Sequence, residues 1–131
     1  MRTLGRCAAV AGIALGLAIG FGSAREGLAQ GSTEHLIQAI PGNKFDKPML
    51  VIKAGDTVTW MNAGGFHNVN ADDGSFRCSN GCDQTGGNGE PSSNSWSFSL
   101  TFEEPGMVPY FCEVHGNTGG RGMSGVVIVQ P

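Results

Sequence analysis

The feature that most constrains the fold is a strict alternation of apolar and polar residues from Ser95 to Phe102. The apolar members are Trp96, Phe98, Leu100 and Phe102, and serine or threonine separates most of them. Because successive side chains of a strand point to opposite faces, this pattern predicts a β-strand with one buried face.

Five other segments also suit strands, and turn signals separate several of them. They are Glu34 to Ile40, Met49 to Lys53, Thr57 to Asn62, Val108 to Cys112 and Gly125 to Val129. The turns are marked by Pro41-Gly42, Ala54-Gly55-Asp56 and Glu104-Pro105-Gly106. No segment beyond the N-terminal region has a convincing helical period, so an all-β sandwich is expected.

Residues 72–94 differ in composition from the predicted strands. Gly, Asn, Ser, Asp and Pro dominate the segment, and apolar residues are almost absent. The flanking pieces are too small to fold separately. The segment is therefore interpreted as an insertion in a single domain, either an ordered insertion or a mobile loop.

The N-terminus has the features of a secretory signal peptide. Arg2 and Arg6 precede an apolar run from Cys7 to Phe21, and small residues follow. The run is too short for a membrane span. Cleavage is expected after Ala29, or after Ala24, which makes 1–29 the signal peptide and 30–131 one soluble, exported, periplasmic-type domain.

Charge and cysteine content limit the partners of the mature chain. After cleavage at Ala29, five basic and ten acidic residues remain, a net charge of −5. This balance argues against nucleic acid and anionic membranes as partners, and we expect a monomer without membrane insertion. Three cysteines remain, which in an oxidising compartment means one pair and one thiol held free.

A set of metal-binding side chains explains the free thiol. Cys112 is followed by His115 and, beyond a glycine-rich turn over residues 116–122, by Met123; His67 lies far upstream. Glycine allows the tight return that brings the three C-terminal side chains together. Two imidazoles, a thiolate and a weak axial thioether are the donors of an electron-transfer copper site.

Each of these residues has a simpler interpretation when taken alone. A lone histidine in a loop, such as His67, is more often solvated than ligating. A buried cysteine at a strand end, such as Cys112, is usually a small hydrophobic residue. His35 has no metal-binding residue near it in sequence and is expected at the surface.

Four blocks of sequence resemble the copper-site blocks of small blue-copper proteins, a cupredoxin group that includes plastocyanin, pseudoazurin and amicyanin. They are Asn62-Ala63-Gly64-Gly65-Phe66-His67-Asn68-Val69, Glu104-Pro105-Gly106, Tyr110-Phe111-Cys112-Glu113-Val114-His115-Gly116 and Gly122-Met123-Ser124-Gly125. The resemblance implies a Greek-key sandwich of about eight strands with one type 1 copper ion at one end. It implies His67, Cys112, His115 and Met123 as ligands, and Asn68 hydrogen-bonding across to the second loop.

Three departures from the plastocyanin pattern matter. Seven residues separate His115 from Met123, a longer gap than in plastocyanins. Met107, or a carbonyl of Gly64 or Gly65, is therefore an alternative axial donor. Phe111 stands where plastocyanins place a phenol, and the insertion carries an additional cysteine pair.

That cysteine pair, Cys78 and Cys82, most simply forms a disulfide that pins the insertion. A ring of this size contributes about 2 kcal/mol on the loop-closure model. The alternative is a redox-active or copper-binding CxxxC, which no predicted helix or basic residue beyond Arg77 would activate.

The function that follows is a mobile one-electron carrier between redox partner proteins. These partners would dock transiently near His115, with Phe66 and Val114 in a small apolar patch around it. The alternative is a copper-handling protein in which the metal is cargo. An enzyme is not expected, because copper enzymes of this type need further histidines and only His35 remains.

Overall fold

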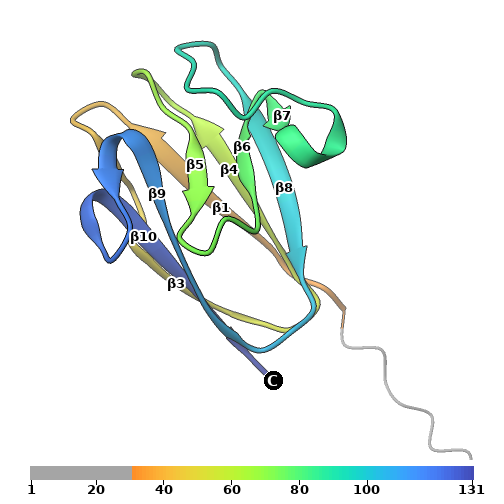
Figure 1. Cartoon of the computed structure of the whole chain (residues 1–131). Helices are drawn as coiled ribbons and strands as arrows, with labels where there is room; N and C mark the ends of the chain where they lie inside the picture. Colours follow the sequence, from red (N-terminus) through yellow and green to blue (C-terminus); the bar gives the residue numbers. More distant parts are fainter. Residues whose placement is uncertain (1–30) are drawn as a thin grey trace, which may run out of the picture.

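The computed structural model describes residues 31–131, so the predicted signal peptide lies outside the described residues. Ten strands and one short 3₁₀ turn make up this part of the chain (Figure 1). Their bounds are β1 Glu34–Ile40, β2 Lys44–Phe45, β3 Met49–Lys53, β4 Asp56–Asn62, β5 Val69–Ala71, β6 Arg77–Ser79, β7 Gly81–Cys82, η1 Asp83–Thr85, β8 Ser97–Phe102, β9 Gly106–Asn117 and β10 Arg121–Gln130.

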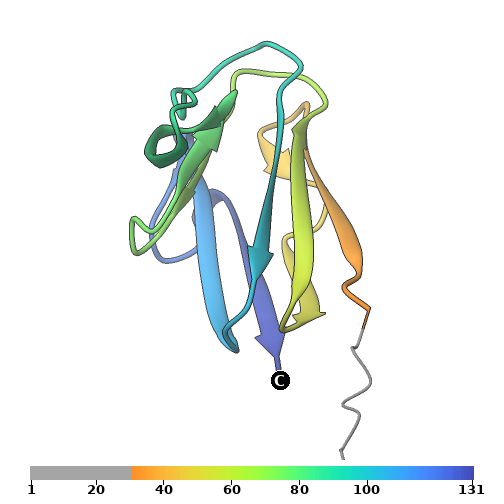
Figure 2. The same cartoon turned by 90° about the vertical axis from the view of Figure 1, so that its right-hand side faces the viewer.

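The strands form two sheets that face each other, as Figure 2 shows from the side. One sheet has the order β2-β1-β4-β8 and the other β3-β10-β9-β5-β6-β7. Most pairs are antiparallel, but β1 runs parallel to β4 and β10 runs parallel to β3. The expected Greek-key sandwich is confirmed, with two of its ten strands only two residues long.

Trp60 is the centre of the core. It is fully buried on β4, stacks on Phe98 of β8 at a ring-centroid distance of 5.3 Å, and meets Tyr110 of β9 edge-on at 5.4 Å. Because β4 and β9 belong to different sheets, the contact between Trp60 and Tyr110 joins the two layers. Aromatic side chains bury more area than other core residues, so Trp60 contributes strongly to holding the layers together.

The strands predicted from alternation are present, with small shifts at their ends. Glu34–Ile40 and Met49–Lys53 have the predicted bounds. The strand predicted at Val108 to Cys112 is longer, because β9 continues to Asn117 and pairs again with β10 beyond the proposed metal-binding residues.

The insertion is ordered and extends the second sheet. Residues 77–82 form β6 and β7, which pair antiparallel and place Cys78 opposite Cys82. The two cysteines form the expected disulfide, with a Cα–Cα distance of 4.1 Å. The insertion therefore belongs to the sandwich, next to β5 at the sheet edge.

Among the described residues, no helix is long and apolar enough to cross a membrane.

Candidate metal centre

His67 follows β4 on a loop that is fastened to the segment before β8. Its backbone N–H donates to the carbonyl of Ser92 (3.2 Å) and its carbonyl accepts from the N–H of Ser92 (3.0 Å). The indole N–H of Trp96 also donates to the His67 carbonyl at 3.1 Å. His67 is fully buried. The loop thus holds the imidazole in a fixed place.

The other candidates lie where β9 and β10 lose their regular register. Gly116 pairs with Gly122 and Phe111 pairs with Ser124. Between these pairs β9 has four residues, from Cys112 to His115, whereas β10 has only Met123. This bulge makes β9 leave the sheet and return, which places Cys112, His115 and Met123 at one end of the sandwich.

Both histidines turn the same ring nitrogen toward the thiol of Cys112. The Nδ1 atoms of His67 and His115 each lie 3.7 Å from the Cys112 Sγ. The donor atoms of the three residues all lie within 4.8 Å of one another. Cys112 is the free cysteine of the described residues and is fully buried.

These separations fit a shared metal ion. With the bond lengths that zinc makes to such donors, about 2.3 Å to sulfur and about 2.0 Å to nitrogen, a separation of 3.7 Å corresponds to an angle of about 120° at the ion. A trigonal plane of two imidazoles and one thiolate has this angle and is the arrangement that copper adopts in electron-transfer sites.

Electrostatics favours the ligating form of His67. Burial lowers the pKa of His67, and the neighbouring His115 lowers it further. A neutral imidazole has a free lone pair for a metal, whereas a protonated one does not. The buried histidine is therefore ready to bind without first losing a proton at neutral pH.

Met123 is the buried methionine at this end, with an exposed fraction of 1%. Met107, an alternative axial donor in the sequence analysis, lies at the start of β9 and is 71% exposed. Met107 lies five positions before Cys112 along β9, a distance of about 17 Å at the usual rise. The position of Met107 therefore rules out this alternative.

Asn68 joins the two loops. Its side chain is fully buried, and its Oδ1 accepts from the N–H of Glu113 at 3.0 Å. Because Asn68 follows His67 and Glu113 follows Cys112, this hydrogen bond fixes the spacing of the two loops. Its Nδ2 donates to the carbonyl of Gly89 in the insertion (3.0 Å).

Gly65 packs directly against the imidazole of His67. Its φ angle is +107°, and a Cβ atom at this position would lie 2.3 Å from the His67 Nε2. Position 65 requires glycine for two reasons: the backbone has a positive φ angle, and there is no space for a Cβ atom.

The charged side chains around this end were not predicted from the sequence. Arg77 donates from Nε (2.9 Å) and Nη2 (2.6 Å) to the carboxylate of Glu113. This pairing, followed by smaller contributions from Asn68 and Asn70, lowers the pKa of Glu113. No local pattern links residues 36 positions apart, so the pairing could be found only from the fold.

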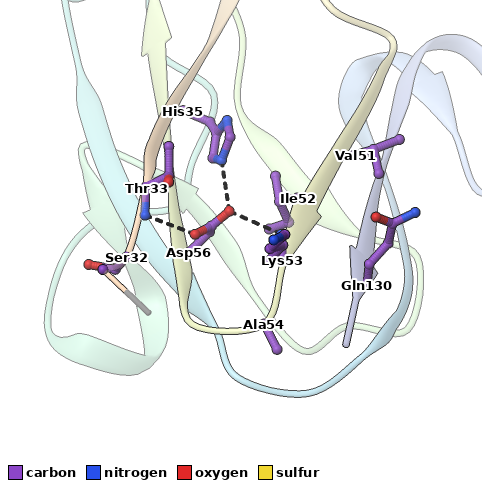
Figure 3. A pocket seen from close by; sticks show the side chains of 10 residues that line it. Ser32, Thr33, His35, Val51, Ile52, Lys53, Ala54, Asp56 and Gln130 are labelled. Carbon is purple, nitrogen blue, oxygen red and sulfur yellow. Dashed lines mark hydrogen bonds and ion pairs between the residues drawn. The ribbon is translucent and has the colours of Figure 1, made fainter. Parts of the chain in front are cut away.

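His35 belongs to a second polar cluster around Asp56, which begins β4, whereas the His67 loop follows the other end of β4. Its Nε2 is 3.0 Å from the buried carboxylate of Asp56, which also accepts from the N–H groups of Thr33 (2.8 Å) and Lys53 (3.0 Å) (Figure 3). These residues line a cavity of about 350 Å³. His35 is thus a structural partner of Asp56, a role that sequence distance concealed.

Comparison with known proteins gives a consistent result. The family described as "Copper binding proteins, plastocyanin/azurin family" matches residues 37–130. The chloroplastic plastocyanin of Tetradesmus obliquus is 37% identical over 87 residues, which are 66% of this chain and 58% of that protein. The plastocyanin of Scenedesmus fuscus is 36% identical over 94 residues, which are 66% of this chain and 86% of that protein. The chain thus spans less than two thirds of the Tetradesmus protein.

Solved structures of amicyanin share the fold. A Met-to-Gln variant in the Cu(I) form is 26% identical with a TM-score of 0.51, covering 74% of this chain and 82% of that chain. An oxidised Met-to-Leu variant is 28% identical with a TM-score of 0.52, covering 79% and 87%.

The sandwich and the histidine–cysteine cluster at its end define a cupredoxin. The chain belongs to the plastocyanin/azurin family of copper-binding proteins. Its cofactor is one type 1 copper ion, as expected from the sequence.

Proposed function

We propose that this chain is an exported one-electron carrier whose copper is held by His67, Cys112, His115 and Met123. When bound, copper supplies reversible one-electron Cu(II)/Cu(I) chemistry. The observation that carries the proposal is the equal 3.7 Å separation of both histidine Nδ1 atoms from the Cys112 sulfur. Met123, buried at the bulge opposite these residues, would supply the fourth and weaker donor.

The scaffold supports electron transfer by limiting rearrangement. His67 is fixed by Ser92 and Trp96, and the second loop is fixed to the first by Asn68. A site whose ligands cannot move must serve both oxidation states with one geometry. A rigid three-donor plane with a weak fourth donor does so at little cost in reorganisation.

The electron is proposed to leave through His115. This residue is half-buried, whereas His67 and Cys112 are fully buried. Its chain neighbour Val114 is 46% exposed, and Phe66, next to His67, is 50% exposed. Two exposed apolar side chains beside the ligand histidines suit a small docking patch for brief encounters with redox partner proteins.

The proposal does not include an enzyme activity. Copper enzymes of related type need additional histidine-rich metal sites, and the chain has three histidines in total. The third, His35, is bound to Asp56 at the other end of β4.

Export and the domain limits are part of the proposal. Residues 1–29 are proposed as a signal peptide, with cleavage after Ala29 or after Ala24, and 30–131 as a single monomeric, soluble, periplasmic-type copper domain. The Cys78–Cys82 disulfide supports an oxidising compartment, since such bonds are rare in the cytosol.

Voltammetry of the copper-loaded chain 30–131 tests the function. We expect a reversible one-electron couple and fast self-exchange, which His115→Ala slows or abolishes. The control His35→Ala, which removes a histidine far from the site, should leave both unchanged. Labile Cu(I) with no stable oxidised form would instead show that copper is cargo.

A further inference from the structure

Arg77 in the insertion connects three carboxylates, those of Glu113, Asp83 and Glu90. Besides its paired hydrogen bonds to Glu113, its Nη1 donates to Asp83 (2.8 Å) and to Glu90 (3.3 Å). The hydrogen bonds to Glu113, Asp83 and Glu90, in that order, raise the pKa of Arg77, so it stays charged. Only the planar guanidinium has donors in enough directions to serve these carboxylates at once.

The contacts of Arg77 close into a ring that includes both metal-binding loops. From Arg77 the ring passes to Asp83, whose Oδ1 accepts from the N–H of Gly89. The carbonyl of Gly89 accepts from Asn68, and the Oδ1 of Asn68 accepts from the N–H of Glu113. The carboxylate of Glu113 returns to Arg77.

The disulfide joins the chain neighbours of two members of this ring. Cys78 follows Arg77 directly, and Cys82 precedes Asp83 directly, so the bond between the two cysteines holds these two partners together. Gly89 is also tightly packed, because a Cβ at this position would lie 2.4 Å from the Arg77 carbonyl. The insertion therefore holds Arg77 and the Gly89 carbonyl close together, where they contact Glu113 and Asn68.

We infer that the insertion braces the metal-binding loops and that Arg77 is its positioning residue, acting through Glu113 on the backbone next to Cys112. This inference rests on the proposed function of the copper centre. The Asn68–Glu113 hydrogen bond connects the two metal-binding loops directly. The brace is the second connection between them, which runs outside the two loops through Arg77, Asp83 and Gly89.

Charge and geometry make separate contributions that variants can distinguish. Arg77→Met removes both the charge and the planar fork, whereas Arg77→Lys keeps the charge and loses the fork. Arg121→Met is the matched control, since Arg121 is exposed at the start of β10 and lies outside the ring.

Amide hydrogen exchange in the copper-free chain tests the brace without relying on the metal. Losing a hydrogen bond to a charged group makes local opening roughly tenfold or more easier. We therefore expect the amides of Glu113 and Gly89 to exchange about tenfold faster in both Arg77 variants. In the Arg77 variants, the amides of Val58 and Trp60 in β4 should exchange as in the unmodified chain. In Arg121→Met, the amides of all four residues should exchange as in the unmodified chain.

The midpoint potential of the copper-loaded chain tests the effect on the centre. A positioning role predicts that Arg77→Lys shifts the potential although the net charge is unchanged. Arg77→Met should shift it further, toward lower values, because the nearby carboxylates are then uncompensated. The double variant Cys78→Ser/Cys82→Ser should shift the potential in the same direction as Arg77→Lys, since it loosens the same ring.

Two results would overturn the inference. One is unchanged Glu113 and Gly89 exchange in both Arg77 variants. The other is a potential that is unchanged in Arg77→Lys and is displaced equally by Arg77→Met and Arg121→Met, which would mean an effect of net charge alone. A reversible couple in the unmodified chain under either result would leave the electron-carrier function standing, so the two proposals fail separately.

Discussion

Replacing Gly65 by alanine tests the packing of the His67 loop. The added Cβ would lie 2.3 Å from Nε2, 2.9 Å from Cδ2 and 3.1 Å from Cε1 of His67. All three distances are shorter than an ordinary van der Waals contact of about 3.5 Å, so the imidazole or the loop must move by about 1 Å.

The magnitude has two parts. An alanine held at a positive φ of +107° costs about 1–2 kcal/mol of backbone strain. Overpacking a fixed site costs about 1–3 kcal/mol more. We therefore expect Gly65→Ala to lower the free energy of unfolding of the copper-free chain by about 2–5 kcal/mol, measured by denaturant titration.

Gly42 provides the matched control. Its φ of +95° is similar, and a Cβ there would meet no atom within 4 Å. Gly42→Ala should therefore show the backbone cost alone, about 1–2 kcal/mol, with an unchanged visible spectrum after copper loading. Equal destabilisation by the two variants, together with an unchanged spectrum in Gly65→Ala, would refute the proposed packing of Gly65 against His67.

Two further predictions concern the axial position and acid stability. Met123→Leu should keep the intense visible band and shift the midpoint potential; an unchanged potential would mean that another atom holds the axial position. Protonation of Asp56 should destabilise the fold in acid. Hydrogen bonds from the backbones of Lys53 and Thr33, followed by His35, lower the pKa of Asp56 from 3.8 to about 2. Stability that is present above pH 3.8 should therefore decrease as the pH falls toward about 2, and Asp56→Asn should remove this part of the pH dependence in acid-unfolding curves.

Alternation and turn signals were enough to predict most of the sandwich. Phe98 of β8 and the Val58–Trp60 face of β4 are buried in the core, and Leu100 and Phe102 of β8 pack against it, because a half-buried strand needs one apolar face. The four proposed copper-binding residues were found from their donor chemistry, and the fold brings His67, Cys112 and His115 together.

The parts that sequence did not predict depend on long-range polar contacts. β5, β6 and β7 are only two or three residues long, too short to show a period that could reveal them. Arg77 and Glu113 are 36 residues apart, and His35 and Asp56 are 21 apart. Charged pairs carry no periodic signal, and only the register of the strands sets which of them meet.

The visible spectrum of the copper-loaded chain tests the central claim most directly. With Cys112 as the thiolate donor, the chain should show an intense thiolate-to-Cu(II) charge-transfer band that Cys112→Ser abolishes. A band of the same intensity in Cys112→Ser would contradict the assignment, and the electron-carrier proposal would fail with it.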